Sequence, residues 1–217
     1  MARQIRYIIP EVPHHIMQRG NNHQIIFFDQ VDRKFFCKNL KKYGEEENVQ
    51  IGSYCLMTNH IHLLLYPSSE KGLINFMKLT SQLYTQYINW KYKRSGKLWE
   101  NRYKLHLVDP ECEWVIARYI ELNPVRAGMV GRAIDYEYSS ARKNINGAID
   151  HVISRDIIKS KYVDYQNFVN ENAGDLEKIS LALQQGKAFG GSSFIEKIEK
   201  MFDTVFSIRK RGRPKNK

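Results

Sequence analysis

The segment from Met57 to Leu65, MTNHIHLLL, constrains the fold of this chain more than any other. It opens a tight apolar run and carries two of the seven histidines, His60 and His62, one residue apart. In a β-strand, residues two positions apart lie on one face, so the histidines would share one face and the apolar residues the other. One face can then hold a divalent metal through two imidazoles while the other anchors the strand in a core. Many such pairs bind no metal, so the rest of the chain must decide.

The elements around this segment follow a ferredoxin-like order. Short apolar runs bounded by turn residues predict strands at residues 14–19, 49–57, 60–66 and 103–108. Helical spacing of apolar residues predicts helices from Asp29 or Asp32 to Tyr43 and over residues 73–93, and Pro110 opens another helix that Pro124 ends. This order predicts an α+β fold: a ferredoxin-like antiparallel sheet with helices on one face, and the other face free for a site.

Two elements carry finer expectations. In the strand 49–57, alternation places four residues on one face: Val49, Ile51, Ser53 and Cys55. In the helix 73–93, an apolar and aromatic stripe that runs from Leu73 to Trp90 is predicted to pack in the core.

The formal net charge of +11 favours a polyanionic partner, most simply nucleic acid. No long apolar span or leader segment is recognised, which argues against a membrane. The three cysteines are odd in number and far apart, so neither a disulfide framework nor a zinc knuckle is expected. A reducing cytoplasmic location, in association with the nucleoid, is the expectation.

The composition changes along the chain and predicts three parts. Residues 1–145 would form the catalytic domain, 150–208 a small helical extension, and 209–217 a basic tail with six positive charges and no acid. Within the tail, Arg211 and Arg213 belong to an Arg-Gly-Arg-Pro segment like the core of an AT-hook, which lies in a narrow minor groove. A plain basic end that adds non-specific phosphate affinity is the alternative.

The helix after Pro110 carries a second candidate pair. Tyr119 and Asn123 are four residues apart, so they project from one helix face, one turn apart. A phenol and a carboxamide there could supply a nucleophile and an oxygen ligand for Mg²⁺ or Mn²⁺. The alternative is structural, because Asn before Pro commonly ends a helix and most of the 13 tyrosines must be packing residues.

Four blocks together resemble the HUH single-tyrosine transposases, and among them the branch of REP-associated tyrosine transposases. The blocks occur in the family's order within residues 6–142: His15 to Asn22 (HIMQRGNN), Leu56 to Leu64 (LMTNHIHLL), Gly96 to Tyr103 (GKLWENRY) and Arg118 to Gly128 (RYIELNPVRAG). The resemblance implies cleavage of single-stranded DNA beside a hairpin, through a tyrosine that forms a 5′-phosphotyrosine and releases a 3′-hydroxyl.

The resemblance also assigns roles residue by residue. It implies that Tyr119 is the nucleophile, that His60 and His62 are metal ligands for Mg²⁺ or Mn²⁺, and that Asn123 takes the place of a polar ligand that is often Gln. The arginines of the matched blocks and of the tail are the candidate DNA-binding residues: Arg19, Arg102, Arg118, Arg126, Arg211 and Arg213. The expected partner is single-stranded DNA with a repeat-like hairpin, and the protein would act as a monomer or homodimer.

A second class of function stays open at this point. The same fold could serve as a non-catalytic regulator that binds structured nucleic acid, with the histidines serving structure, since RNA-binding sheets of this topology use aromatic residues on their strands. The two candidate histidines and Tyr119 favour the enzyme. The remaining five histidines receive no role: His14, His15, His23, His106 and His151.

Overall fold

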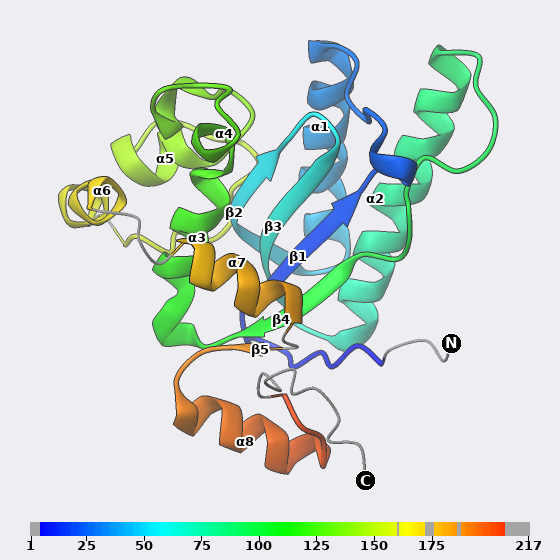
Figure 1. Cartoon of the computed structure of the whole chain (residues 1–217). Helices are drawn as coiled ribbons and strands as arrows, with labels where there is room; N and C mark the ends of the chain where they lie inside the picture. The colour runs from blue at the N-terminus through cyan, green and yellow to red at the C-terminus, as the bar shows by residue number, and fades with distance from the viewer. Residues whose placement is uncertain (1–4, 160, 172–175, 186–187, 207–217) are drawn as a thin grey trace, which may run out of the picture.

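A five-stranded sheet runs through the centre of the molecule (Figure 1). The structure is a computed structural model and describes residues 5–159, 161–171, 176–185 and 188–206. Within these residues the strand order is β2-β3-β1-β4-β5; the first four strands are antiparallel to their neighbours, and β5 is parallel to β4. The strands are β1 His14–Arg19, β2 Val49–Leu56, β3 His60–Pro67, β4 Lys104–Val108 and β5 Ala188–Phe189. The α+β class and the ferredoxin-like core are confirmed.

Helices α1 (Gln30–Glu46) and α2 (Glu70–Lys91) pack together on one face of this sheet (Figure 1). Asp29 caps α1 by accepting a hydrogen bond from the Asp32 amide, and the Asp32 side chain accepts from the Asp29 amide in return. This capping box satisfies backbone donors that the start of a helix leaves unpaired. The core below both helices includes Phe36, Leu40, Ile61, Leu63, Leu65, Leu73 and Phe76. The apolar side of the His-x-His strand is therefore the predicted anchor.

The second face of the sheet is also covered, which differs from the expected free face. Helix α3 (Glu113–Glu121) packs on β2 and β3, and α5 (Ala141–Asn146), α6 (Tyr162–Asn170) and α7 (Leu176–Gln185) join the same core cluster or border it. Periodicity shows that α3 has an apolar side but not what that side packs against. The residues that bury it on this face include Leu64, Tyr66, Ile116, Ile120 and Tyr165.

Strand β2 changes face at Gly52. Ile51 before it and Leu56 after it lie in the core under α1 and α2, whereas Ser53 and Cys55 lie on the α3 side. The register against β3 shifts between Ile51 and Ser53, so a β-bulge reverses the alternation. A Cβ at Gly52 would lie 2.8 Å from two side-chain carbons, which explains the glycine. The predicted common face of Val49, Ile51, Ser53 and Cys55 is therefore wrong beyond the bulge.

Helix α2 extends past the end of the sheet (Figure 1). Leu73 and Tyr84 are fully buried, as the stripe predicts, but Trp90 is 79% exposed. The prediction that the stripe packs in the core as far as Trp90 is wrong at Trp90 itself. Ile88, in the same turn, is fully buried, and two further residues turn Trp90 about 200° around the helix, away from the buried side.

The rest of the described chain consists of short helices and the C-terminal segment. The short helices are η1 Asn21–His23, η2 Pro110–Cys112, α4 Asn123–Arg126 and η3 Ala133–Asp135. Helix α8 (Ser192–Phe202) packs with residues near the N-terminus, including Tyr7. No helix among the described residues is long and apolar enough to cross a membrane. The predicted boundary near residue 145 stays a prediction, and the basic tail 209–217 lies outside the described residues.

Candidate active site

The pairing of β1 with β3 builds one wall of a cavity. Arg19 lies opposite His60, and Met17 lies opposite His62, across this antiparallel pair. Side chains opposite each other on neighbouring strands point to the same face of the sheet. His62 is only 4% exposed, so the histidine face meets packed protein and not open solvent.

Tyr119 reaches this wall from the last turn of α3. Its ring is perpendicular to that of His62, with 5.8 Å between the ring centroids, and lies 5.9 Å from the ring of His15. The guanidinium carbon of Arg126, in α4, lies 5.3 Å from the centre of the Tyr119 ring. Tyr119 is 6% exposed. Packing on three sides therefore restricts the rotation of this side chain.

Asn123 follows Tyr119 after a break in the helix at Leu122. Its Nδ2 donates to the carbonyl oxygens of Tyr119 at 2.8 Å and Ile120 at 3.2 Å. These bonds satisfy carbonyls at the end of α3, which is the helix-ending role that an Asn before Pro predicts. The amide oxygen Oδ1 is the atom of Asn123 that remains to accept or to ligate.

A cavity of about 300 Å³ brings the four predicted chemical residues together. It is lined by Met17, Arg19, Met57, His60, His62, Tyr119, Asn123, Arg126, Ala127 and Ser180. The last of these comes from α7, so the C-terminal segment also contributes to the wall. Sequence positions from 17 to 180 therefore converge on one site.

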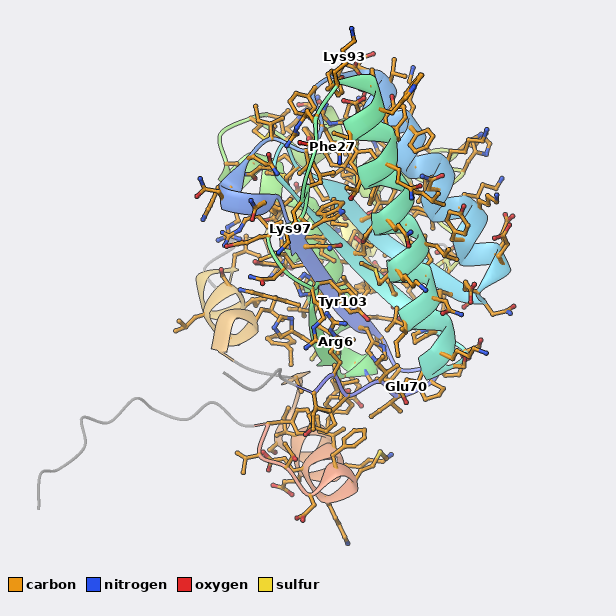
Figure 2. All side chains as sticks on the ribbon, turned by 90° about the vertical axis from the view of Figure 1, so that its right-hand side faces the viewer. Arg6, Phe27, Glu70, Lys93, Lys97 and Tyr103 are labelled. Carbon is orange, nitrogen blue, oxygen red and sulfur yellow. The ribbon has the colours of Figure 1, made fainter. Side chains whose placement is uncertain are left out.

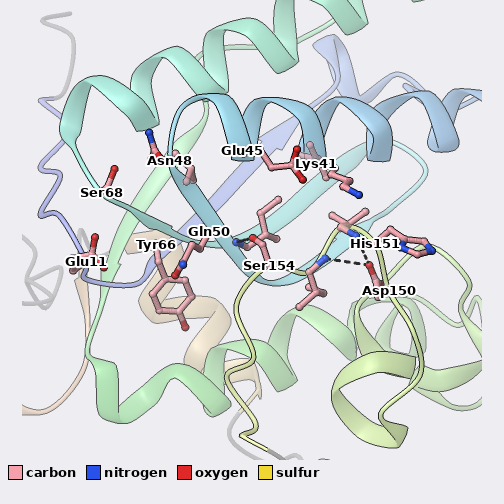
Figure 3. Close-up of a pocket in the computed structure, with 16 residues that line it drawn as sticks. Glu11, Lys41, Glu45, Asn48, Gln50, Tyr66, Ser68, Asp150, His151 and Ser154 are labelled. Atoms are coloured by element: carbon pink, nitrogen blue, oxygen red, sulfur yellow. Dashed lines mark hydrogen bonds between the residues drawn. The ribbon is translucent and has the colours of Figure 1, made fainter.

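A larger cavity, of about 590 Å³, lies between α1, β2 and residues 150–154 (Figure 3). Its wall includes Lys41, Gln50, Asp150 and His151, and none of the predicted site residues lines it. We place the candidate site in the smaller cavity, because His60, His62 and Tyr119 meet there and burial lowers the pKa values of both histidines.

Burial keeps the histidines of the smaller cavity neutral. It lowers the pKa of His60 to about 4, and the charge of Arg19 adds to this effect. Burial also lowers the pKa of His62 well below its ordinary value, and His15 and His60 lower it further. A neutral imidazole keeps a lone pair on one nitrogen, which is the form that binds a metal.

The donor set fits a hard divalent cation with open coordination positions. Among the described residues, no cluster of three or more His, Cys, Asp or Glu side chains could hold a metal. The candidate ligands are instead two neutral imidazoles, His60 and His62, and the amide oxygen of Asn123. Such a set leaves positions for water and phosphate oxygens, as Mg²⁺ and Mn²⁺ accept.

Glu121 anchors the end of α3 through a buried hydrogen-bond network. Its Oε1 accepts from Ser140 Oγ at 2.6 Å, from Asn144 Nδ2 at 2.7 Å and from Ser53 Oγ at 3.3 Å. Its Oε2 accepts from the Tyr165 hydroxyl at 2.9 Å. Burial raises the pKa of Glu121, and these hydrogen bonds oppose the rise. The helix that carries Tyr119 is thereby tied to β2, α5 and α6.

The model of the family described as "Transposase IS200 like" matches residues 9–123, more than half of the 217 residues. The chain belongs to the IS200-like transposase family. The resemblance to single-tyrosine transposases that the sequence blocks indicate is thereby confirmed.

One solved structure with a TM-score above 0.5 shares the fold of this transposase. A REP-associated tyrosine transposase bound to a REP hairpin superposes with a TM-score of 0.59 at 16% identity, over 72% of this chain and 93% of that one. A putative transposase from Deinococcus radiodurans R1 is more distant, with a TM-score of 0.39 and 17% identity over 55% of this chain and 96% of that one. So is a bacterial tRNA(His) guanylyltransferase-like protein in complex with ATP, with a TM-score of 0.40 and 13% identity over 75% of this chain and 92% of that one. At those TM-scores neither bears on function. The search of curated protein sequences found no match.

The predicted DNA-binding arginines of the transposase fall in different places. Arg19 and Arg126 line the cavity, and Arg19 also pairs with Glu100 at 2.9 Å. Arg102 is exposed and does not line the cavity.

Arg118 is only 5% exposed; it donates to the Phe168 carbonyl at 2.9 Å and lies over the Phe168 ring. It is therefore placed to join α3 to α6, and the expectation of a phosphate contact does not fit its burial. Arg211 and Arg213 lie outside the described residues.

Sequence reasoning missed His15, which lies next to the predicted ligands. Its Nε2 lies 3.0 Å from Nδ1 of His62, and its ring stacks on that of His106 at 5.6 Å. A signal was present: His15, Met17 and Arg19 alternate along one strand and so share a face. Their meeting with His62 depends on the register between β1 and β3, which the sequence does not reveal.

Proposed function

We propose that this transposase is a metal-dependent single-strand DNA endonuclease and strand transferase, with Tyr119 as the nucleophile. The observation that carries the proposal is the convergence of Tyr119, His60, His62 and Asn123 on one cavity, with 5.8 Å between the ring centroids of Tyr119 and His62. Holding the nucleophile and the cation ligands in fixed relation is what an in-line displacement requires.

Strand cleavage would proceed by attack of the Tyr119 phenol on the DNA backbone. The Tyr119 oxygen forms a bond to the scissile phosphorus, and the bond from phosphorus to the 3′-oxygen breaks. The phenol loses its proton and the released 3′-oxygen gains one, which leaves a 5′-phosphotyrosine and a free 3′-hydroxyl. The reverse attack by that hydroxyl rejoins a strand without ATP, because the covalent link keeps the energy of the phosphodiester.

The chain's residues would hold a divalent cation beside this phenol. His60 and His62 would bind it through imidazole nitrogens and Asn123 through Oδ1, and Mg²⁺ or Mn²⁺ suits this set. When bound, the cation would polarise the scissile phosphate and stabilise the charge of the transition state. Such help matters because a protonated phenol is a weak nucleophile.

We infer that the DNA partner is a single strand beside a hairpin. A structurally similar transposase was solved with a REP hairpin, and the +11 net charge suits a polyanion. Arg19 and Arg126 line the cavity and are the arginines that we retain for phosphate contacts there. We also propose that residues 1–145 form the catalytic domain and residues 150–208 a helical extension. The protein would act as a monomer or a homodimer.

Tyr103 is the rival nucleophile, and its position argues against it. It lies in the core cluster under α1 and α2, on the opposite side of the sheet from Tyr119. Figure 2 shows it beside Arg6, whose guanidinium carbon lies 3.6 Å from the centre of its ring. A phenol on that face has no route to His62.

A covalent-adduct assay tests the proposal against the alternative of a non-catalytic nucleic-acid-binding regulator. Incubation with single-stranded hairpin DNA and Mn²⁺ should give a protein–DNA adduct on a denaturing gel, with mass spectrometry placing the nucleotide on Tyr119. Tyr119→Phe should bind the DNA but form no adduct, while Tyr103→Phe should form it. Binding without any adduct would favour the regulator, and an adduct on another tyrosine would refute the assignment.

A further inference from the structure

Each of the two proposed ligands forms a hydrogen bond through its Nδ1. His60 Nδ1 lies 2.7 Å from Oδ1 of Asn59, and His62 Nδ1 lies 3.0 Å from Nε2 of His15. A neutral imidazole has one protonated nitrogen and one with a lone pair. The partner of Nδ1 therefore decides whether Nε2 can present a lone pair to the cavity.

The hydrogen bond to Asn59 shows which ring nitrogen of His60 carries the proton. Its Nδ2 donates to the carbonyl oxygen of His23 at 3.2 Å, which turns Oδ1 toward His60. A carboxamide oxygen can only accept, so Nδ1 of His60 must be the donor. The lone pair of His60 is consequently on Nε2.

His15 bonds to Nδ1 of His62, as Asn59 bonds to Nδ1 of His60. It is 2% exposed, and its other ring nitrogen, Nδ1, is buried without a hydrogen-bond partner among the described residues. Burying an unpaired ring nitrogen costs stability, and an apolar side chain of similar size would avoid that cost. The bond to His62 is therefore the interaction that accounts for a histidine at this place.

The same bond fixes what His62 can do. If Nδ1 of His62 donates to His15 Nε2, then Nε2 of His62 keeps its lone pair and can bind a cation. If the donor were His15, Nε2 of His62 would carry a proton and could not ligate. Only the first arrangement matches that of His60.

We propose that Asn59 and His15 are positioning residues that hold His60 and His62 as Nδ1-protonated tautomers, with both Nε2 lone pairs available to one divalent cation. The proposal rests on the proposed function, because it concerns the same metal site. Neither residue is proposed to touch the cation or the DNA. Loss of such outer partners typically weakens metal binding by about 10- to 100-fold.

The tautomers can be measured without any metal. Long-range ¹H–¹⁵N spectra of the full chain labelled at histidine distinguish Nδ1–H from Nε2–H rings, and the His60→Ala and His62→Ala variants assign the signals. We expect Nδ1–H for both ligands in the wild type, and a tautomer mixture at His60 in Asn59→Ala. Asn59→Asp should restore the wild-type form, because its carboxylate accepts the same hydrogen bond. An Nε2–H signal for either ligand in the wild type would overturn the proposal.

Manganese titration followed by electron paramagnetic resonance measures the consequence. Asn59→Ala and His15→Leu should each bind Mn²⁺ about 10- to 100-fold more weakly than the wild type, while Asn59→Asp and His15→Gln, which keep an acceptor, should bind within a few-fold. His14→Leu is the matched control: His14 is also fully buried on β1, but its ring bonds to Val12 O and the Ile9 amide, away from the site.

The outcomes separate the two proposals. If His60→Ala abolishes Mn²⁺ binding while Asn59→Ala and His15→Leu bind like the wild type, the positioning roles are overturned and the metal site stands. If the wild type binds no Mn²⁺, or if binding survives in both His60→Ala and His62→Ala, both proposals fail. Should His15→Leu not fold, the wild-type tautomers and the Asn59 pair still decide the matter.

Discussion

Replacing Glu121 with Ala should destabilise the protein strongly, although Glu121 is outside the cavity. Four buried groups lose this acceptor: Ser53, Ser140, Asn144 and Tyr165, each no more than 1% exposed. The two serines can still donate, Ser53 to Ser140 Oγ and Ser140 to the Tyr54 carbonyl, so the donors left without an acceptor are the Tyr165 hydroxyl and the N–H of Asn144 that does not bond to the Gly52 carbonyl. Each unsatisfied donor costs about 1–3 kcal/mol, and removal of a buried charge offsets part of the sum. With two such donors and this offset, we expect a loss of about 2–5 kcal/mol.

The matched variant is Glu121→Gln. Its amide oxygen can still accept from Ser140 and Asn144, and its Nε2 can donate to the Tyr165 hydroxyl, so the loss should be about 1 kcal/mol or less. For a chain of this size, 1 kcal/mol corresponds to about 2–4 °C in Tm, so a 4 kcal/mol loss lowers Tm by about 8–16 °C. Thermal unfolding followed by circular dichroism measures both variants. An Ala variant within about 1 kcal/mol of the wild type, or a Gln variant as damaged as Ala, would refute this account of the network.

Three further predictions concern the site and the tail. His60→Ala, His62→Ala or addition of EDTA should abolish cleavage of hairpin DNA and leave hairpin binding largely intact; cleavage that persists in EDTA would contradict the metal assignment. Arg118→Ala should lower stability by about 2 kcal/mol, since the Phe168 carbonyl loses its charged donor, whereas Arg126→Ala should keep Tm but lower the salt slope of single-strand binding by about 0.7; equal Tm values for the two variants would contradict their placement. Removal of residues 209–217 should weaken DNA affinity and flatten its salt dependence by about 0.7 to 0.9 for every phosphate that the tail neutralises, without stopping the reaction on saturating DNA; an unchanged slope in a filter-binding assay would make the tail a bystander.

Local patterns in the sequence predict much of this fold. The alternation around His60 and His62 gives a strand with one anchored face, and Asp29 or Asp32 indicates the start of α1, because these features depend on residues a few positions apart. The predictions for the β2 face beyond Gly52 and for the burial of Trp90 fail for the opposite reason. The first depends on contacts with Ile157 and Tyr66, and the second on which side of the last turn of α2 other parts of the chain cover.

The candidate site divides in the same way. His60, His62, Tyr119 and Asn123 can be proposed from spacing and resemblance, since each is close in sequence to a partner of the right chemistry. His15 lies 47 residues from His62, and Tyr165 lies 44 residues from Glu121. Which such residues meet depends on strand register and on how the helices pack, and a single sequence carries no direct signal of either.

The hydrogen bonds of the Glu121 carboxylate show that the segment matched by the family model is shorter than the segment needed for folding. The family match ends at residue 123, yet three of the four groups that bond to this carboxylate come from Ser140, Asn144 and Tyr165. A fragment that ends at residue 123 would keep Tyr119, but the buried carboxylate of Glu121 would retain only the hydrogen bond from Ser53. The segment that folds independently is therefore longer than the segment that identifies the family, and an expression fragment should extend at least through α6.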